Sequence, residues 1–230
     1  MRAPASLLSP GDGARSHLPR DGRFQRDAVR SLDTLSGVAG VALFGGSFDP
    51  VHVAHLIVAE AAADALGCAV RFLPAREQPL KRGARAAHQA TPEQRADMLD
   101  LATQGNARFG VERVELGLPT PSYTVRTLRA LRDRAAGNRY TLLLGADAAR
   151  DLAEWWEVEA LPELADIVVF ARPGASVVRH PLITRVIPVP MIDLSATQVR
   201  ARVKDGRSIR YLVPDPVREY IAAHGLYLGA

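Results

Sequence analysis

The sequence of 230 residues contains a single cysteine, Cys68, which excludes an intramolecular disulfide framework and a zinc site built from several cysteines. No run of about 18 uncharged apolar residues occurs, so no segment is expected to span a membrane. The first twenty residues offer only Leu7 and Leu8 where a signal peptide needs about 7–15 apolar residues. With an ordinary hydrophobic share of 47%, these absences predict a globular cytoplasmic protein and exclude a disordered or fibrous chain.

Lysine is almost absent, because Lys81 and Lys204 are the only lysines and the remaining cationic side chains are arginines. The net charge of +4 and the isoelectric point near 9.6 are compatible with anionic substrates or with nucleic acid. The arginines, however, are spread along the whole chain, whereas the residues that bind nucleic acid usually cluster. No nucleic-acid partner is therefore expected.

Residues 1–37 differ from the rest because they combine several glycines, prolines and arginines with no sustained hydrophobic period. This composition predicts a flexible N-terminal extension, within which Phe24–Leu35 is long enough for a short helix. From Val38 onward, short apolar runs alternate with helical stretches, and no long linker or internal repeat follows. We therefore expect one domain over residues 38–230, and the sequence leaves its oligomeric state open.

Short continuous apolar runs are typical of strands that are buried on both faces of a sheet. Such runs are Val41–Phe44, Val70–Leu73, Tyr140–Leu144 and Ile167–Phe170, and further strands are expected at Arg113–Leu118 and Arg185–Val189. Helices are expected at His55–Leu66, Pro92–Thr103, Tyr123–Ala135 and Asp147–Ala153. The alternation predicts an α/β fold, a Rossmann-like, doubly wound, mainly parallel sheet with helices on both faces. Ligands of such sheets lie at the carboxyl ends of the strands.

The first expected strand runs into two glycines, Gly45 and Gly46, which allow a sharp turn and a close approach of a ligand to the backbone. His52 and His55 follow at the start of the next helix, where a spacing of three places both imidazoles on one face. Together with the free N–H groups of the helix start, they are expected to face one anion. A metal site is not expected, because no third histidine or nearby cysteine accompanies the pair.

Near the C-terminus, Ser195 and Gln198 have the spacing of a capping box, which predicts a helix over residues 196–204. The amides of its first turn, the Thr197 hydroxyl and the Arg200 guanidinium offer several donors to a phosphate group. Taken alone, such a pattern marks only the start of a helix, so its assignment depends on the other segments.

Two more segments place suitable groups at the start of an expected helix. Gly145 would admit a flat base close to the backbone, and the Asp147 carboxylate can accept hydrogen bonds from ribose hydroxyls. The segment Ser122–Thr124 opens the helix that follows it, and the free amides of that helix can bind a carboxylate. Each pattern is weak by itself, but the occurrence of several such patterns in this order is not expected by chance.

The segments together resemble the nucleotidyltransferase superfamily that transfers a nucleoside monophosphate with loss of pyrophosphate. The segment GGSFDPVHVAH at 45–55 is similar to its nucleotide-binding signature, with Ala54 in place of the usual glycine. The long form of this signature is most similar to the bacterial nicotinate-nucleotide adenylyltransferase family. Other segments that resemble this family are LSATQVR at 194–200, LGAD at 144–147, TPSYT at 120–124 and PLK at 79–81, where Leu80 replaces a common histidine.

The resemblance implies an enzyme that transfers AMP from ATP to nicotinate mononucleotide, giving deamido-NAD and pyrophosphate by direct in-line attack on the α-phosphate. It implies catalytic roles for His52 and His55 and a Mg²⁺ ion that is bound through the ATP phosphates. The ATP-binding residues implied are Gly45, Gly46, Ser47, Phe48, Gly145, Asp147, Ser195, Thr197 and Arg200. Those implied for nicotinate mononucleotide are Lys81, Ser122, Tyr123, Thr124 and Trp155.

The choice of nicotinate as acceptor depends on Trp155 and on the segment PSYT at 121–124. Trp155 and Trp156 are adjacent and therefore cannot both face the core. The resemblance implies that Trp155 stacks on the nicotinate ring, and Trp156 replaces a frequent tyrosine. Alternatives within the superfamily are a preference for nicotinamide mononucleotide or another phosphorylated acceptor such as phosphopantetheine. An alternative of another class is a nucleotide-binding regulator or a nucleic-acid-associated protein that uses the basic charge. This alternative is disfavoured because both histidines and Arg200 are present.

Overall fold

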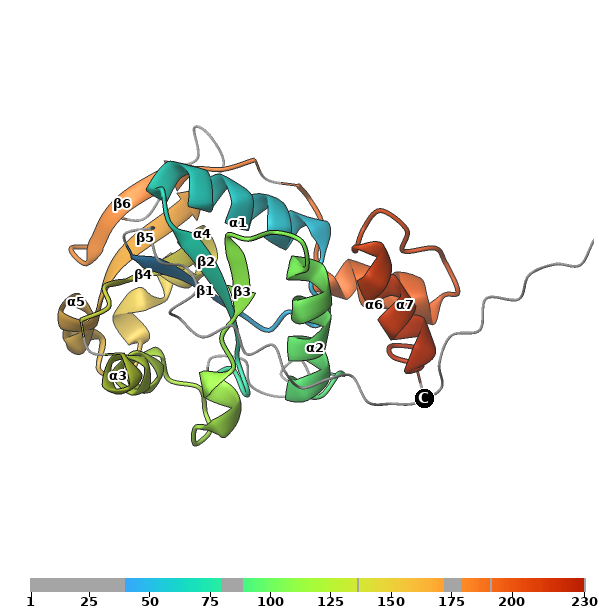
Figure 1. Cartoon of the computed structure of the whole chain (residues 1–230), viewed down its shortest axis with the longest axis horizontal. Helices are drawn as coiled ribbons and strands as arrows, with labels where there is room; N and C mark the ends of the chain where they lie inside the picture. Colours follow the sequence, from blue (N-terminus) through green and yellow to red (C-terminus); the bar gives the residue numbers. More distant parts are fainter. Residues whose placement is uncertain (1–39, 80–88, 136, 172–178, 191, 230) are drawn as a thin grey trace, which may run out of the picture.

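The computed structural model describes residues 40–79, 89–135, 137–171, 179–190 and 192–229. Within these ranges, six strands form one sheet in the order β3-β2-β1-β4-β5-β6, and every neighbouring pair is parallel (Figure 1). The strands are β1 (Val41–Gly46), β2 (Ala69–Pro74), β3 (Phe109–Val111), β4 (Tyr140–Gly145), β5 (Ala165–Ala171) and β6 (Ile183–Pro188). The strand order reverses between β1 and β4, which is where a doubly wound sheet opens its ligand crevice.

Helices cover both faces of the sheet (Figure 1). They are α1 (Val53–Leu66), α2 (Pro92–Thr103), α3 (Thr124–Arg134), α4 (Ala146–Arg150), α5 (Leu161–Leu164), α6 (Ala196–Lys204) and α7 (Asp215–Ala223), with short 3-10 turns at Val114–Gly117, Leu152–Glu154 and Val158–Ala160. Successive strand residues point to opposite faces, so Phe44 joins the core under α1 and α2 while Leu43 joins the core under α3. The sheet is therefore packed between two hydrophobic cores, one on each face, which fix the positions of its strand ends.

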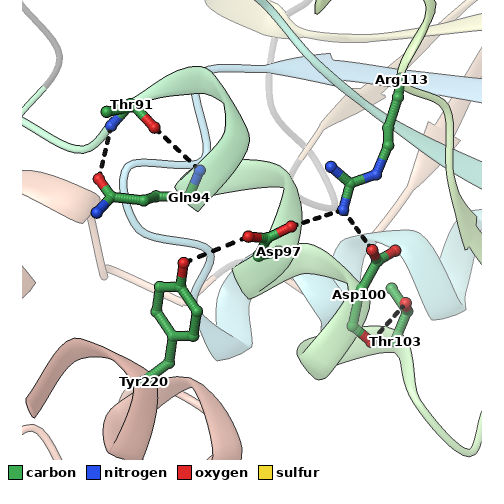
Figure 2. A network of polar contacts seen from close by, with 7 residues as sticks. All are labelled: Thr91, Gln94, Asp97, Asp100, Thr103, Arg113 and Tyr220. Carbon is green, nitrogen blue, oxygen red and sulfur yellow. Dashed lines mark hydrogen bonds and ion pairs between the residues drawn. The ribbon is translucent and has the colours of Figure 1, made fainter. Parts of the chain in front are cut away.

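Helix α2 begins as its sequence predicts, with Thr91 and Gln94 forming a reciprocal capping box behind Pro92 (Figure 2). Its acidic face is held by Arg113, whose guanidinium donates to the Asp97 carboxylate at 2.9 Å and also to that of Asp100. The Tyr220 hydroxyl of α7 donates to the other Asp97 oxygen at 3.4 Å. These contacts join α2 to the segment after β3 and to the C-terminal helix, so α2 is a fixed support.

The predicted fold class is confirmed by the parallel sheet and the helices on both of its faces. The strand predicted at Arg113–Leu118 is wrong, because its alternating apolar residues lie in and around a 3-10 turn and the edge strand is instead Phe109–Val111. The helix predicted at Asp147–Ala153 ends earlier, at Arg150. The extension predicted at 1–37 lies outside the described residues. None of the helices that the structure describes is long and apolar enough to cross a membrane.

Candidate functional site

The two glycines that end β1, Gly45 and Gly46, affect the loop between β1 and α1 in different ways. A Cβ on Gly45 would meet no atom of the described residues within 4 Å, whereas a Cβ on Gly46 would lie 2.9 Å from the Phe48 ring. Phe48 has a φ of 50°, a strained value for a non-glycine residue, and its ring is buried against Phe44 and Phe72. Packing of the Phe48 side chain therefore fixes the conformation of the loop, while the backbone at Gly45 stays accessible to a ligand.

The two histidines predicted to act together are in direct contact. Their rings stack with centroids 3.7 Å apart and planes inclined by 25°, and the His52 backbone N–H donates to His55 Nδ1 at 3.2 Å. A neutral His55 that accepts at Nδ1 carries its proton on Nε2, so Nε2 is its donor. The Phe48 ring packs edge-on against His55 at 5.0 Å, which holds the imidazole in place.

Burial keeps both imidazoles uncharged in the free protein. His52 is 4% exposed, and desolvation lowers its pKa to about 4. Desolvation and the neighbouring His52 also hold the pKa of His55 well below its usual value. The pair therefore offers hydrogen-bond donors near neutral pH without a fixed positive charge, and a bound polyanion would favour its protonation.

The start of α1 supplies fewer free amides than the sequence predicts. The Val53 amide donates to the Leu212 carbonyl at 2.9 Å, and the His55 amide donates to the His52 carbonyl at 2.9 Å. The segment that carries Leu212 precedes α7, and nothing in the local pattern around His52 indicates this partner. The expectation of a free helix N-terminus is therefore corrected, because a distant loop caps it.

Arg200 brings the C-terminal segment to the histidine loop, as predicted. Its guanidinium donates to the Asp49 carbonyl at 2.6 Å and to the Thr197 hydroxyl at 3.2 Å. Ser195 caps α6 as expected, since its Oγ accepts from the Gln198 amide at 3.2 Å. Ser195 and Thr197 are exposed. Two segments that are 151 residues apart in sequence are thus joined by one hydrogen bond.

Asp49 is the buried centre of this junction. Its carboxylate accepts from the Gln89 amide at 2.9 Å, the Ala90 amide at 3.2 Å and the Tyr227 hydroxyl at 2.7 Å. Burial, followed by the charge of Asp49, raises the pKa of Tyr227, which keeps the phenol protonated as a donor. The histidine loop is therefore anchored to three segments, at 89–90, at Arg200 and at Tyr227.

The end of β4 places the residues predicted to bind the nucleoside. Gly145 caps α4, and a Cβ there would lie 3.4 Å from the Phe170 ring. Asp147 is exposed and forms an ion pair with Arg150. The Asp147 carboxylate therefore faces solvent at the carboxyl end of a strand next to β1, where the ribose of a bound nucleotide is expected.

The two tryptophans separate as predicted, one inward and one outward. Trp155 packs against the core under α3, and its indole N–H is buried with no acceptor among the described residues. Trp156 is 37% exposed and stacks on Tyr123 with ring centroids 5.0 Å apart. The Arg126 guanidinium lies 5.0 Å from the Tyr123 ring and 4.8 Å from the Trp156 ring, which is cation–π geometry.

The segment predicted to bind the acceptor is tied to the end of β2. The Ser122 hydroxyl accepts from the amides of Arg76 at 3.0 Å and Glu77 at 3.3 Å, and the Ser122 amide donates to the Glu77 carbonyl at 2.9 Å. The amides of Thr124 and Val125, in the first turn of α3, have no acceptor among the described residues. Lys81, the other predicted residue, lies outside the described part of the chain.

Sequence reasoning missed two buried charged residues beside these segments. Arg95 of α2 is 0% exposed, and Glu115, which follows β3, is 5% exposed and accepts from the Thr127 hydroxyl at 2.8 Å. Burial raises the pKa of Glu115. Arg95 precedes Met98 and Leu99 by three and four positions, so it shares the buried face of α2 with them. A cationic residue on the apolar face of a predicted helix was the sequence signal that could have identified Arg95.

No cluster of three or more histidine, cysteine, aspartate or glutamate side chains suited to a metal ion occurs in the described ranges. The Asp49 carboxylate is already engaged by two amides and a hydroxyl. A magnesium ion would therefore fit this site as a partner of a bound phosphate chain, because Mg²⁺ commonly takes most of its ligands from phosphate and water.

The buried histidine gives a testable pH dependence of stability. Because the pKa of His52 falls from 6.5 to about 4 on folding, the unfolded chain binds more protons between these values. The free energy of unfolding should therefore fall by about 2 kcal/mol between pH 7 and pH 5 from His52 alone. Urea unfolding at both pH values measures this change. His52→Gln should lose this part of the dependence, and the exposed control His224→Gln should keep it; equal slopes in both variants would contradict the prediction.

Comparison with known proteins identifies relatives along most of the chain. Residues 43–202 match the cytidylyltransferase-like family. A probable nicotinate-nucleotide adenylyltransferase of Roseiflexus sp. (strain RS-1) is 44% identical over 200 residues, which cover 82% of this chain and 98% of that protein. A probable nicotinate-nucleotide adenylyltransferase of Thermus thermophilus is also 44% identical, over 189 residues that cover 81% of this chain and 98% of that protein.

A solved structure has the same fold at low identity. The nicotinic acid mononucleotide adenylyltransferase of Plasmodium falciparum, in complex with NaAD, superposes with a TM-score of 0.65 at 17% identity and covers 82% of this chain and 97% of that chain. The sequence matches span far more than half of the chain and include the two segments that Arg200 joins. The chain therefore belongs to the cytidylyltransferase-like family and, within it, to the nicotinate-nucleotide adenylyltransferases.

Proposed function

We propose that the chain transfers AMP from ATP to nicotinate mononucleotide, forming deamido-NAD and pyrophosphate by direct in-line attack on the α-phosphorus. The observation that carries this proposal is the junction at Asp49, where Arg200 joins the phosphate-binding segment of α6 to the loop of His52 and His55. A triphosphate that contacts both segments would extend across the carboxyl end of β1. Family membership supplies the two substrates, and the junction supplies the place for the phosphates.

In this proposal, catalysis rests on position and charge. The attacking phosphate oxygen of the mononucleotide is already anionic, so no strong general base is needed. The His55 Nε2–H would donate to the phosphate oxygens on which charge develops, with His52 stacked behind it. Thr197 and Arg200 would hold the leaving pyrophosphate. Mg²⁺ bound together with ATP would supply positive charge that offsets the negative charge of the phosphates.

The acceptor would bind between the ends of β2 and β4. Ser122 already orders the backbone of Arg76 and Glu77, and the free amides of Thr124 and Val125 are suited to a carboxylate. Trp155 would offer a surface for the pyridine ring, next to the pair formed by Trp156 and Tyr123. This arrangement favours the carboxylate of nicotinate over the uncharged carboxamide of nicotinamide.

The direct test is pyrophosphate release from ATP and Mg²⁺ with each of three acceptors supplied separately. Nicotinate mononucleotide should give the fastest release, with one deamido-NAD formed per pyrophosphate. Nicotinamide mononucleotide should react more slowly, and phosphopantetheine should not react. Release that depends on phosphopantetheine alone would overturn the proposed substrate, and release without any acceptor would overturn transfer to a mononucleotide.

Gly45 and Gly46, the last two residues of β1, provide a matched pair of variants. Gly45→Ala places a methyl group in open space, so the fold should survive while the close approach of ATP is hindered. A loss of about 1 kcal/mol of binding corresponds to a roughly fivefold lower kcat/KM for ATP. Gly46→Ala forces the methyl group against the buried Phe48 ring, so the melting temperature should fall by several degrees.

Steady-state kinetics and thermal unfolding of both variants check this division of roles. The prediction is contradicted if Gly45→Ala lowers the melting temperature as much as Gly46→Ala does. It is also contradicted if Gly45→Ala leaves kcat/KM for ATP unchanged.

A further inference from the structure

Two loops leave the sheet side by side where β1 and β2 end. The register pairs Gly46 with Pro74, and the last backbone bond between the strands runs from the Ala75 amide to the Gly46 carbonyl at 2.9 Å. Beyond this point the first loop leads through Ser47 to the histidines. The second loop leads through Arg76 to the hydrogen bonds with Ser122. The two loops thus carry the proposed ATP and acceptor segments away from a common origin.

Arg95 bridges the two loops immediately beyond the last bond of the strand pair. Its guanidinium donates through Nη1 to the Ser47 carbonyl at 2.6 Å and through Nη2 to the Arg76 carbonyl at 3.4 Å. Each acceptor is the next residue after the last bonded pair, Gly46 and Ala75. A planar guanidinium has donors that point in fixed directions, so one group can hold two carbonyls at a set separation. Arg95 therefore continues the ladder at the point where the strands diverge.

The position of this guanidinium is itself fixed. Arg95 lies in the first turns of the capped helix α2, next to Met98 and Leu99 in the core, and it is 0% exposed. Burial lowers the pKa of Arg95, while Asp49 and other acidic groups including Glu115 favour its charged form. No ion pair joins Arg95 to a carboxylate among the described residues.

A buried guanidinium that binds carbonyl groups in place of a carboxylate is costly to keep, because its desolvation is only partly offset. An apolar side chain of similar size at this position of α2 would pack with Met98 and Leu99 at less cost. The contacts that Arg95 makes are directed at the two loops and not at other parts of the core. These contacts indicate that Arg95 holds the two loops in position.

We propose that Arg95 is a positioning residue that sets the ATP loop and the acceptor loop relative to each other for transfer of AMP. The inference rests on the proposed function, because that function assigns a substrate to each loop. Each loop can bind its own substrate without the bridge, but in-line attack needs the mononucleotide phosphate and the α-phosphorus aligned. Loss of alignment lowers the rate of transfer far more than it lowers binding.

Arg95→Lys and Arg95→Ala test the proposal in the full chain. Both variants should have a kcat about tenfold lower than the unaltered chain, with KM for ATP and for nicotinate mononucleotide each changed less than about threefold. Lysine keeps the charge but lacks the fork that reaches both carbonyls. Guanidinium ion at millimolar concentration should raise the kcat of Arg95→Ala, because it can enter the space left by the side chain and donate to both carbonyls.

Arg113 provides the matched control, because it also binds α2 but does so through the acidic side chains Asp97 and Asp100 and not through loop carbonyls (Figure 2). Arg113→Lys and Arg113→Ala should lower the melting temperature while kcat per folded molecule stays the same, and guanidinium should not change their kcat. Circular dichroism of each variant measures the folded fraction. If Arg95→Ala does not fold, the kcat of Arg95→Lys decides alone.

The inference is wrong if the Arg95 variants keep kcat per folded molecule, as the Arg113 variants should, or if guanidinium has no effect on a folded Arg95→Ala. It is also wrong if the KM values rise as much as kcat falls, since that result means loss of binding and not of alignment. Failure of the unaltered chain to release pyrophosphate with nicotinate mononucleotide would instead refute the proposed function. The two failures are therefore distinguishable.

Discussion

Replacing His55 by alanine is expected to lower kcat/KM by about 100-fold or more while the protein stays folded. The size of this effect is that of losing one donor positioned on the charge that develops in the transition state. His55 is half-buried in the first turn of α1, where its ring packs against the rings of Phe44, Phe48 and His52. The variant should therefore lose its donor with a modest loss of stability.

The nitrogen that acts can be identified by replacing the ring with an amide. His55 Nδ1 accepts from the His52 amide, which leaves Nε2 as the donor to the phosphates. The side-chain amide of glutamine reaches about as far as Nε2, and that of asparagine about as far as Nδ1. His55→Gln should therefore keep more activity than His55→Asn.

Steady-state kinetics with ATP and nicotinate mononucleotide, together with the melting temperatures, check both expectations. His224→Ala is the matched control, because it removes an exposed imidazole that follows the last residue of α7 and stacks on Tyr220. Near-full activity of folded His55→Ala would mean that the histidines are structural and that the proposed mechanism is wrong. Equal activity of the glutamine and asparagine variants would contradict the assignment of Nε2.

Nicotinate mononucleotide is expected to be used at least about 10-fold more efficiently than nicotinamide mononucleotide. The Thr124 and Val125 amides have no acceptor within the described ranges, so both can donate to carboxylate oxygens. A carboxamide would turn its NH₂ group toward one of these donors and leave a buried donor unpaired, which costs about 1–3 kcal/mol. It would also lose the attraction of the negative charge to the start of α3.

One substitution removes the Thr124 amide donor without removing helix α3. Thr124 is the first residue of α3, and Tyr123 before it has φ −81° and ψ 124°. Proline is tolerated at the first helical position, and this preceding backbone conformation suits it. Thr124→Pro therefore removes one amide donor while the helix remains, and it should reduce the preference for nicotinate. Thr124→Ala keeps the amide and should keep the preference.

The comparison is made by measuring kcat/KM for the two mononucleotides at saturating ATP in the unaltered chain and in both variants. Substitution of the Tyr123 side chain should weaken the preference less than Thr124→Pro, because the proposed donors are backbone amides. Equal values of kcat/KM for the two mononucleotides in the unaltered chain would mean that the carboxylate is not recognised here. The enzyme would then have dual specificity.

Local patterns in the sequence were enough to predict much of the fold. The apolar runs at Val41–Phe44 and Tyr140–Leu144 are strands, and helix α2 spans the predicted residues Pro92–Thr103. These predictions held because hydrophobic period and capping depend on neighbours in sequence. The pattern failed at Arg113–Leu118, where alternation of period two coincides with a 3-10 turn. Short segments are stabilised by contacts to distant residues, so their own pattern decides little.

The sequence by itself determined the parallel α/β fold, the paired histidines after the glycines and the helix that Ser195 caps and that carries Arg200. Only the tertiary structure decided that Leu212 caps α1, that Asp49 is bound by Tyr227, and that Arg95 joins two loops. Each of these contacts joins residues at least 19 positions apart, and each depends on where a strand or helix ends in space. Propensity and period carry no such information, because they describe only near neighbours along the chain.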